Sequence, residues 1–492
     1  MARPMMIQGT TSNAGKSLLC AALCRIFRQE GLRVAPFKSQ NMALNSYVTE
    51  NGLEMGRAQV LQAQAAGLEP DVRMNPILLK PTTDVGSQVI VNGVSRGNYA
   101  AKEYFRRKTE LIPDILAAYQ SLSAENDIIV IEGAGSPAEI NLKQNDIVNM
   151  GLAALVDAPV LLVGDIDPGG VFASLYGTVA LLEQSERERI RGLIINKFRG
   201  DRSILEPGLD MLEELTGIPV AGVVPWLDLE LDDEDSLSQR LHRRGGEAMV
   251  DIAVIRLPRL SNFTDFNPLE RFAEVSLRYV RHPAELGAPD LVILPGTKST
   301  ISDLRWLKTS GLAHKICDFH QSGGPLLGIC GGYQMLGRRV SDPMNTEGGG
   351  SEDGLELFPS ETVLQGGKTL RRVSGQSVCT QGLWQVLKGQ RFHGYEIHTG
   401  RTQSDESPFS LLDQGEEDGS AVQNVAGTYV HGLFDHGPFA AALVNALLAQ
   451  KGFAQTATGT DWRTHQDREL DRLAHSVRES LDMDLIHGLV KL

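Results

Sequence analysis

The fold of the first half is decided by the stretch Pro4-Met-Met-Ile-Gln-Gly-Thr-Thr-Ser-Asn-Ala-Gly-Lys-Ser17. It predicts a short buried strand, a glycine-containing loop and the start of a helix, which is the arrangement of a phosphate-binding loop. Loop amides and a helix N-terminus bind phosphate oxygens, a lysine neutralises their charge, and a hydroxyl binds Mg²⁺. The predicted ATP-binding residues of this loop are Thr10, Asn13, Gly15, Lys16 and Ser17, the last also a Mg²⁺ ligand.

The loop departs from the usual phosphate-loop spacing in one respect. Five residues rather than four separate Gly9 from Gly15, and Thr10 occupies the usual glycine position. The alternative is a chance Gly-Lys-Ser at a helix start. The strand before it and the helix after it disfavour that alternative.

Short apolar runs and amphipathic stretches alternate from this loop up to residue 227. Apolar strands that alternate with helices are typical of a parallel sheet covered on both faces. We therefore predict an α/β domain over residues 1–227 and a polar, charged linker over 228–249. The predicted strands are 4–8, 34–37, 128–131, 160–163, 193–195 and 220–223, and the predicted helices are 18–29, 55–66, 147–156, 172–183 and 204–215.

Polar side chains that follow later strands extend the predicted nucleotide site. Glu132 ends the apolar run Asp127-Ile-Ile-Val-Ile-Glu and is our candidate for a second Mg²⁺ contact, although it would also suit a helix cap. Asn196 follows another strand, where an amide can pair with adenine. Ligands bind at the carboxyl edge of such sheets, so Lys38 is expected there. We assign substrate or phosphate binding to Lys38, Asn41 and Arg57, with a solvated surface charge as the open alternative for Arg57.

A second α/β pattern starts at Val250 and contains a different chemistry. Pro325-Leu-Leu-Gly-Ile-Cys-Gly-Gly-Tyr-Gln334 predicts an apolar strand, a tight turn at Cys330 and a helix. This is a nucleophile elbow with sulfur in place of the hydroxyl, and a helix N-terminus favours a thiolate. A buried structural cysteine is the alternative, which the flanking glycines disfavour.

A cysteine nucleophile needs a base and an oxyanion hole. Gly427-Thr-Tyr-Val-His-Gly432 places His431 at a strand end and makes it our candidate base, with His393 and His398 as competitors. The amide of Gly331 follows the nucleophile. The region of Gly296, where an earlier strand ends in a glycine turn, is expected to supply the second oxyanion donor.

The second domain is predicted over residues 250–450, with strands at 252–257, 291–294, 325–329 and 428–430. Residues 342–367 are rich in glycine, glutamate and serine and predict a surface insertion. The charged residues 451–492 predict a helical tail without a chemical role.

The composition of the 492 residues restricts the partners and the compartment. A formal net charge of -14 disfavours nucleic acid and anionic membrane surfaces as partners. No apolar run is long enough for a membrane span, and the start carries no signal-peptide pattern. The five cysteines are scattered, without a disulfide framework, which favours a reduced, cytoplasmic protein.

Each half resembles a known family in the motifs quoted above. The first half resembles the dethiobiotin synthetase family, which implies ATP-dependent phosphorylation of a carboxylate to an acyl phosphate. The second resembles the class I glutamine amidotransferases, which implies glutamine hydrolysis through a thioester with release of ammonia. Many of those proteins carry His-Pro-Glu, but here the sequence is His431-Gly-Leu433. We therefore predict a Cys330–His431 dyad, with the ring oriented by a backbone carbonyl, a water molecule or a carboxylate from elsewhere in the chain, such as Glu396 or Asp435.

The whole chain resembles the cobyrinic acid amidating enzymes of cobalamin biosynthesis, and among them the cobyric acid synthase branch. The resemblance implies successive amidation of the b, d, e and g carboxylates of adenosylcobyrinic acid a,c-diamide with ATP and glutamine, the corrin being the substrate. The alternatives are an a,c-diamide synthase, a partitioning ATPase and an interaction protein with inactive sites. The segments that carry the resemblance are Phe37–Ser46, Glu54–Gln59, Met74–Pro81 and His393–His398.

Overall fold

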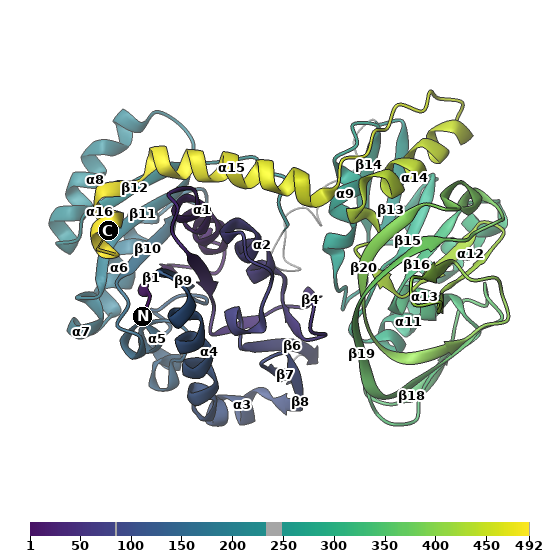
Figure 1. The fold of residues 1–492 in the computed structure, drawn as a ribbon, viewed down its shortest axis with the longest axis horizontal. Helices are drawn as coiled ribbons and strands as arrows, with labels where there is room; N and C mark the ends of the chain where they lie inside the picture. The colour runs from purple at the N-terminus through teal and green to yellow at the C-terminus, as the bar shows by residue number, and fades with distance from the viewer. Residues whose placement is uncertain (84–85, 233–247, 492) are drawn as a thin grey trace. The chain divides into compact units, whose positions relative to one another are not determined.

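A computed structural model describes residues 1–83, 86–232 and 248–491 (Figure 1). The chain forms two compact units. The first comprises Met1–Met42, Glu54–Leu231 and Gln466–Leu492, and the second comprises Ala43–Leu53 and Asp232–His465. Each predicted domain is continuous in sequence, whereas the observed units are not. Ala43–Leu53 comes from the first half of the chain but belongs to the second unit, and Gln466–Leu492 comes from the C-terminal end but belongs to the first unit. Residues 233–247 of the predicted linker lie outside the described residues.

The first unit is built on an all-parallel sheet in the order β12-β11-β10-β1-β9-β2. Every strand predicted in this half falls within one of its strands, because strands buried on both faces are continuously apolar and easy to find. The bounds are β1 (Arg3–Gly9), β2 (Val34–Phe37), β9 (Ile128–Glu132), β10 (Val160–Asp165), β11 (Ile190–Phe198) and β12 (Val220–Pro225).

The five predicted helices of this unit start and end within three residues of the predicted positions. Their bounds are α1 (Lys16–Gln29), α2 (Arg57–Ala66), α5 (Met150–Leu155), α6 (Val171–Leu181) and α8 (Arg202–Thr216). The helices α3 (Ala101–Arg107), α4 (Ile112–Glu125) and α7 (Gln184–Arg187) were not predicted. A small sheet of β3 (Gln40–Met42), β6 (Ile77–Thr83), β7 (Gly86–Val91) and β8 (Val94–Ala100) was also not predicted.

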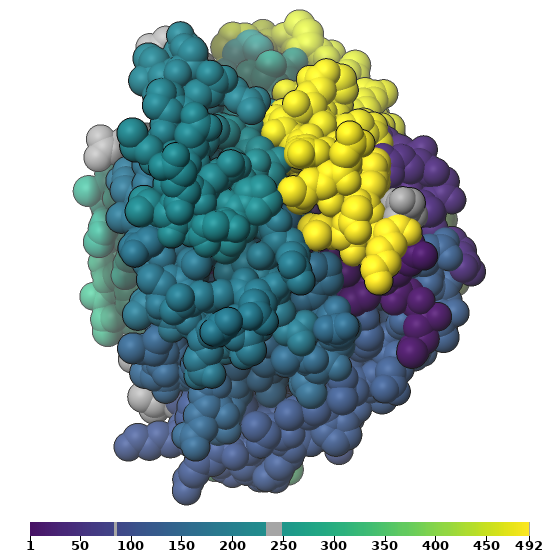
Figure 2. Space-filling view, turned by 90° about the vertical axis from the view of Figure 1, so that its left-hand side faces the viewer, coloured from purple at the N-terminus to yellow at the C-terminus, as the bar shows by residue number. Residues whose placement is uncertain are grey.

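The C-terminal residues complete the core of the first unit. From Gln466 onward, α15 (Trp462–Ser480) and then α16 (Met483–Leu489) pack against α1 through Leu470, Val477 and Ile486, all buried. Figure 2 shows these residues in yellow on the surface beside the N-terminal residues in purple, where Arg3 donates a hydrogen bond to the Val490 carbonyl at 2.7 Å. The segment that the sequence left without a role therefore covers one side of this sheet.

The second unit contains a sheet in the order β14-β13-β15-β16-β24-β23, parallel except for the β23–β24 pair. This order places the carboxyl end of β16 between those of β15 and β24, so the turns after these strands meet at one edge. The bounds are β13 (Val250–Ile255), β14 (Val275–Val280), β15 (Leu291–Leu294), β16 (Leu326–Ile329), β23 (Ser420–Val422) and β24 (Val425–Thr428).

A second sheet of the same unit contains the long hairpin β19 (Glu361–Ser377) and β20 (Arg391–Gln403). The surface insertion predicted over 342–367 is wrong in part, because residues 350–353 and 361–367 are strands of this sheet and Phe358 and Leu364 are buried. Its glycines and glutamates concealed the alternation of buried and exposed positions. The helices of the unit include α11 (Thr300–Thr309), α12 (Leu312–Gln321), α13 (Gly331–Leu336) and α14 (Gly437–Gln450). None of the described helices is both long and apolar enough to cross a membrane.

Candidate active sites

The predicted phosphate loop connects β1 to α1 at the carboxyl edge of the first sheet. Gly15 has a φ of +94°, in the left-handed region that favours glycine, and α1 begins at Lys16. The buried Lys16 ammonium donates hydrogen bonds to the carbonyls of Thr11, Ser12 and Gly135 at 2.8, 3.0 and 3.2 Å. Thr10 donates its amide to Val163 on the adjacent strand β10 at 2.9 Å. The loop thus curls around its lysine.

Glu132, at the end of β9, binds the polar groups that the sequence assigned to this edge. Its Oε1 accepts hydrogen bonds from Ser17 Oγ and from Lys38 Nζ, each at 2.8 Å. Its Oε2 accepts from Gln62 Nε2 at 2.5 Å and from Gln59 Nε2 at 3.4 Å. The carboxylate is fully buried, so the Lys38 ammonium compensates a charge that would otherwise be costly to bury.

The described residues contain no group of three His, Cys, Asp or Glu side chains placed to hold a metal ion. A Mg²⁺ ion in such a loop is held mainly by phosphate oxygens and needs only one or two hard protein oxygens. Ser17 Oγ and Glu132 Oε1 are such oxygens and are in mutual contact, so these residues fit the ion.

The remaining predicted residues lie around the loop with different contacts. Asn196 donates from Nδ2 to the Ala14 carbonyl at 2.8 Å, so its amide holds the loop backbone. The Asn13 carbonyl accepts from Lys197 Nζ at 2.7 Å, a residue that sequence reasoning did not select. Asn41 donates to Gln59 Oε1 at 3.1 Å, and Arg57 is buried at the start of α2.

In the second unit, Cys330 lies at the turn between β16 and α13. Its φ of 52° and ψ of -111° are strained for a residue with a side chain. The glycines around it explain how the turn closes. A Cβ on Gly332 would lie 1.9 Å from the Leu294 carbonyl oxygen, and one on Gly328 would lie 2.7 Å from the Tyr333 nitrogen. This is the geometry of a nucleophile elbow.

The loop after β15 lies directly against this elbow. A Cβ on Gly331 would come within 3.2 Å of the Thr297 amide nitrogen, and a Cβ on Gly296 would come within 3.0 Å of His431 Cε1. Gly331 therefore lies against the loop that contains Gly296, and Gly296 itself lies against the histidine ring. The nearest second amide to Gly331 is that of Thr297.

A buried carboxyl group holds this oxyanion loop. Asp303 Oδ2 accepts hydrogen bonds from Thr297 Oγ1 at 2.5 Å and from the Arg259 amide at 3.0 Å. Burial raises the pKa of Asp303 to about 6, against the lowering effect of those hydrogen bonds.

Of the groups left open to orient the histidine, the structure brings a carboxylate to the ring, and it is one that the sequence did not single out. His431 Nδ1 lies 2.7 Å from Asp265 Oδ2, and the Gly432 amide donates to Asp265 Oδ1 at 3.1 Å. Burial lowers the pKa of His431, but the Asp265 carboxylate and the hydrogen bond with Cys330 outweigh it and hold that pKa above its ordinary value. Cys330, His431 and Asp265 are thus arranged as in a cysteine–histidine–aspartate triad.

The groups proposed from the sequence to orient or replace this histidine make the following contacts. Glu396 pairs with Arg371, and the Asp435 amide donates to the Gly432 carbonyl at 3.1 Å. His393 contacts Ser374 on the hairpin, and His398 stacks on Tyr429.

Asp265 was missed because it lies 166 positions before the histidine, in a 3-10 turn after β13. A signal was present in the sequence. The stretch Phe263-Thr-Asp-Phe266 places an acidic residue between two phenylalanines just after a strand of the same sheet, where a carboxylate needs a partner.

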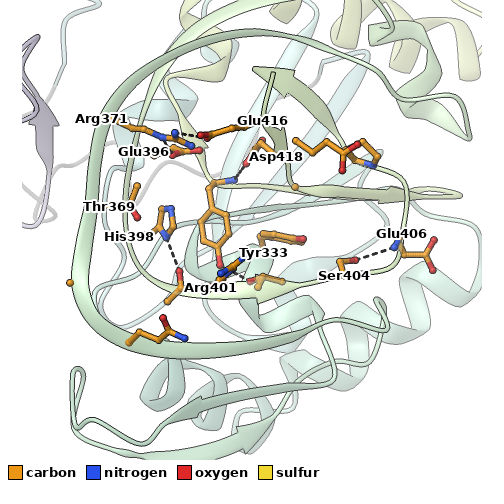
Figure 3. Close-up of a pocket in the computed structure, with 18 of the residues that line it drawn as sticks. Tyr333, Thr369, Arg371, Glu396, His398, Arg401, Ser404, Glu406, Glu416 and Asp418 are labelled. Atoms are coloured by element: carbon orange, nitrogen blue, oxygen red, sulfur yellow. Dashed lines mark hydrogen bonds and ion pairs between the residues drawn. The ribbon is translucent and has the colours of Figure 1, made fainter. Parts of the chain in front are cut away.

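A cavity of about 680 Å³ lies beside the elbow in the second unit (Figure 3). Its polar lining includes Arg371 with Glu396 and Glu416, and Figure 3 shows these three side chains pointing toward one another. Tyr333 of α13 lines it three residues after the nucleophile. Glu396 and His398 also line it, on either side of Ile397, whose carbonyl lies 3.7 Å from Cys330 Sγ.

Comparison with known proteins gives a match for each half of the chain and for the chain as a whole. A family model described as the CobQ/CobB/MinD/ParA nucleotide binding domain matches residues 5–236, and one described as the CobB/CobQ-like glutamine amidotransferase domain matches 251–439. The cobyric acid synthase of Ruminiclostridium cellulolyticum is 54% identical, covering 100% of this chain and 98% of its own. Those of Lachnoclostridium phytofermentans and Listeria monocytogenes are 52% and 50% identical, each covering 100% of this chain and 99% and 97% of their own.

The chain belongs to the cobyric acid synthase family. It is an enzyme of this type, with a nucleotide-binding domain followed by a glutamine amidotransferase domain, as the motifs predicted. The family and its two domains support the use of ATP and glutamine in amidating a corrin carboxylate.

Proposed function

We propose that the enzyme amidates the b, d, e and g carboxylates of adenosylcobyrinic acid a,c-diamide to give adenosylcobyric acid. The observation that carries this proposal is that one chain contains two arrangements. One is a phosphate loop that encloses the Lys16 ammonium and contacts Glu132 through Ser17, and the other is a Cys–His–Asp triad. The first arrangement suits phosphoryl transfer to a carboxylate, and the second suits release of ammonia from glutamine.

In the first unit, a substrate carboxylate oxygen attacks the γ-phosphorus of ATP, which gives an acyl phosphate and ADP. Lys16 donates to carbonyls of the phosphate loop, so its ammonium lies within the loop and is placed to neutralise the transferred group. Mg²⁺, held by Ser17, Glu132 and the phosphates, would withdraw charge from the phosphate oxygens. Lys38, Asn41 and Arg57 are proposed to bind substrate or phosphate, and Asn196 to bind the nucleotide.

In the second unit, Cys330 attacks the carboxamide carbon of glutamine, and the oxyanion is bound by the amides of Gly331 and of the Gly296–Thr297 turn. His431 takes the thiol proton and gives it to the leaving ammonia, so a glutamyl thioester remains. Asp265 holds the ring with Nδ1 protonated, which leaves Nε2 for that transfer. Water then hydrolyses the thioester to glutamate.

Ammonia from the second unit displaces phosphate from the acyl phosphate and forms the amide. The proposal is tested by mass spectrometry of the product made from adenosylcobyrinic acid a,c-diamide with ATP and glutamine. Conversion of all four remaining target carboxylates supports it. A product with only two amides from cobyrinic acid, and no reaction of the diamide, would support the a,c-diamide synthase alternative instead.

A further inference from the structure

The segment Ala43–Leu53 belongs to the second unit although its sequence lies within the first half of the chain. Its strand β4 (Ser46–Val48) lies against the β19–β20 hairpin, where Val48 is fully buried with Tyr395 and Ile397. The Tyr47 ring lies 5.5 Å from that of Tyr395. The segment is therefore an integral part of the glutaminase unit.

The peptide groups of Ser46 bind two residues that both touch the triad histidine. The Ser46 amide donates to Asn262 Oδ1 at 3.1 Å, and the Ser46 carbonyl accepts from the Tyr395 hydroxyl at 3.2 Å. Asn262 Nδ2 lies 3.5 and 3.4 Å from the two ring nitrogens of His431. The Tyr395 ring stacks on the imidazole with centroids 5.4 Å apart and planes 20° apart.

The contact of Asn262 is a packing contact more than a hydrogen bond. Its nitrogen is about equally far from both ring nitrogens, so it does not select one of them as a partner. Asn262 also has a φ of 52°, a conformation that asparagine tolerates better than most residues and that points this amide between Ser46 and the ring. Asp265 fixes one ring nitrogen, while Asn262 and Tyr395 restrict rotation and tilt.

We propose that Ser46, Asn262 and Tyr395 are positioning residues for His431, and that the Ala43–Leu53 segment orients the base of the glutaminase site. This inference rests on the proposed function of the triad. The glutaminase site is then built from two distant parts of the sequence. The backbone that holds the base comes from the half of the chain that otherwise forms the nucleotide-binding unit.

The residues flanking the segment are bound at buried positions of the first unit. Eight residues before Ser46, Lys38 binds Glu132, which also binds Ser17 of the phosphate loop. Directly after the segment, Glu54 pairs with Lys80 at 2.9 Å, and both side chains are buried. The chain that enters the glutaminase unit therefore leaves a few residues after Lys38 and returns at a buried ion pair of the first unit.

The test uses full-length variants that remove these contacts singly. Tyr395→Phe keeps the ring stack but removes the donor to Ser46, and Ser46→Pro removes the amide donor to Asn262. Asn262→Gly keeps the positive φ without the amide group. Glu50→Gln changes an exposed residue of the same segment and is the control. Each is assayed for glutamine hydrolysis, for amidation with ammonium chloride, and for the pH dependence of Cys330 alkylation by iodoacetamide.

We expect Asn262→Gly and Ser46→Pro to lower kcat for glutamine hydrolysis about tenfold or more, and Tyr395→Phe about threefold to tenfold, with KM nearly unchanged. Ammonium-dependent amidation should stay at the level of the parent, and the alkylation profile should move, because the thiol has lost a well-placed base. Glu50→Gln should behave like the parent.

The proposal is overturned if all three variants retain kcat within twofold, or if ammonium-dependent amidation falls in parallel with glutaminase activity. Loss of kcat with an unchanged alkylation profile would also overturn it, since the base would then still be in place. Cys330→Ala is assayed alongside. Glutamine hydrolysis by that variant would refute the proposed triad itself. This assay therefore distinguishes failure of the triad from failure of the proposed positioning residues.

Discussion

The most informative perturbation of the glutaminase site is Asp265→Asn, which changes charge and hydrogen bonding at nearly constant volume. In the parent, one carboxylate oxygen accepts from His431 Nδ1 at 2.7 Å and the other from the Gly432 amide at 3.1 Å. The variant's single carbonyl oxygen can serve only one of these donors. If it keeps the Gly432 amide, its NH₂ group faces Nδ1, and the ring proton moves to Nε2.

That tautomer cannot accept the Cys330 proton, and the ring also loses the carboxylate that raises its pKa. Loss of an orienting carboxylate in this role lowers kcat by about 10³ to 10⁴, or about 4 to 5 kcal/mol in the barrier. Glutamate release should fall by that factor, while ammonium-dependent amidation remains. The matched control is Asp435→Asn, a carboxylate near the same Gly432, which should lose less than tenfold. Glutaminase activity within tenfold of the parent in Asp265→Asn would refute the triad.

Three further perturbations test other parts of the two sites. Lys16→Ala should abolish amidation with either nitrogen source and leave glutamine hydrolysis measurable, because the acyl phosphate is not formed; normal corrin amidation would exclude the phosphate-loop assignment. Gly296→Ala places a methyl group 3.0 Å from His431 Cε1 and should lower glutaminase kcat at least about tenfold without affecting ammonium-dependent amidation, and equal losses in both assays would count against its place in the glutaminase site. The pKa of Asp303 is raised from 3.8 to about 6, mainly by burial, so its stabilising contribution is full below pH 3.8 and is lost as the pH rises through 6. Asp303→Asn should therefore gain stability relative to the parent by up to about 3 kcal/mol between pH 4 and pH 8, measured by urea unfolding at each pH, and a pH-independent difference would contradict the assignment.

The sequence predicted the nucleophile, its base and the phosphate loop because each is encoded locally. Gly-Lys-Ser after an apolar strand and Gly-x-Cys-x-Gly before a helix both report the backbone geometry that they require. Glu132 was also accessible, since it ends a strand that parallel pairing places beside β1. These features depend on neighbours in the chain and on the common edge of a parallel sheet.

Features that depend on distant pairs could not be predicted in the same way. Asp265 is recognisable as a triad member only once the turn after β13 is known to reach His431. Without that knowledge, the absence of a glutamate after His431 suggested a dyad. The assignment of Ala43–Leu53 to the second unit depends on burial of Val48 against the hairpin residues Tyr395 and Ile397. The C-terminal helices have a charged composition that hid the apolar side with Leu470 and Val477.

The central claim is that ammonia made at Cys330 is consumed at a separate, ATP-dependent site. The most direct measurement is corrin amidation by Cys330→Ala, with glutamine and, in parallel, with ammonium chloride at alkaline pH, where free ammonia is abundant. A methyl group cannot form a thioester, whereas the phosphate loop, Glu132 and Lys38 do not use the sulfur. We predict no amide from glutamine, and amide formation with ATP consumption from ammonium. A correctly folded variant that fails with ammonium would show that the cysteine takes part in the synthetase reaction. That result would contradict the claim that ammonia release and amide formation occur at separate sites.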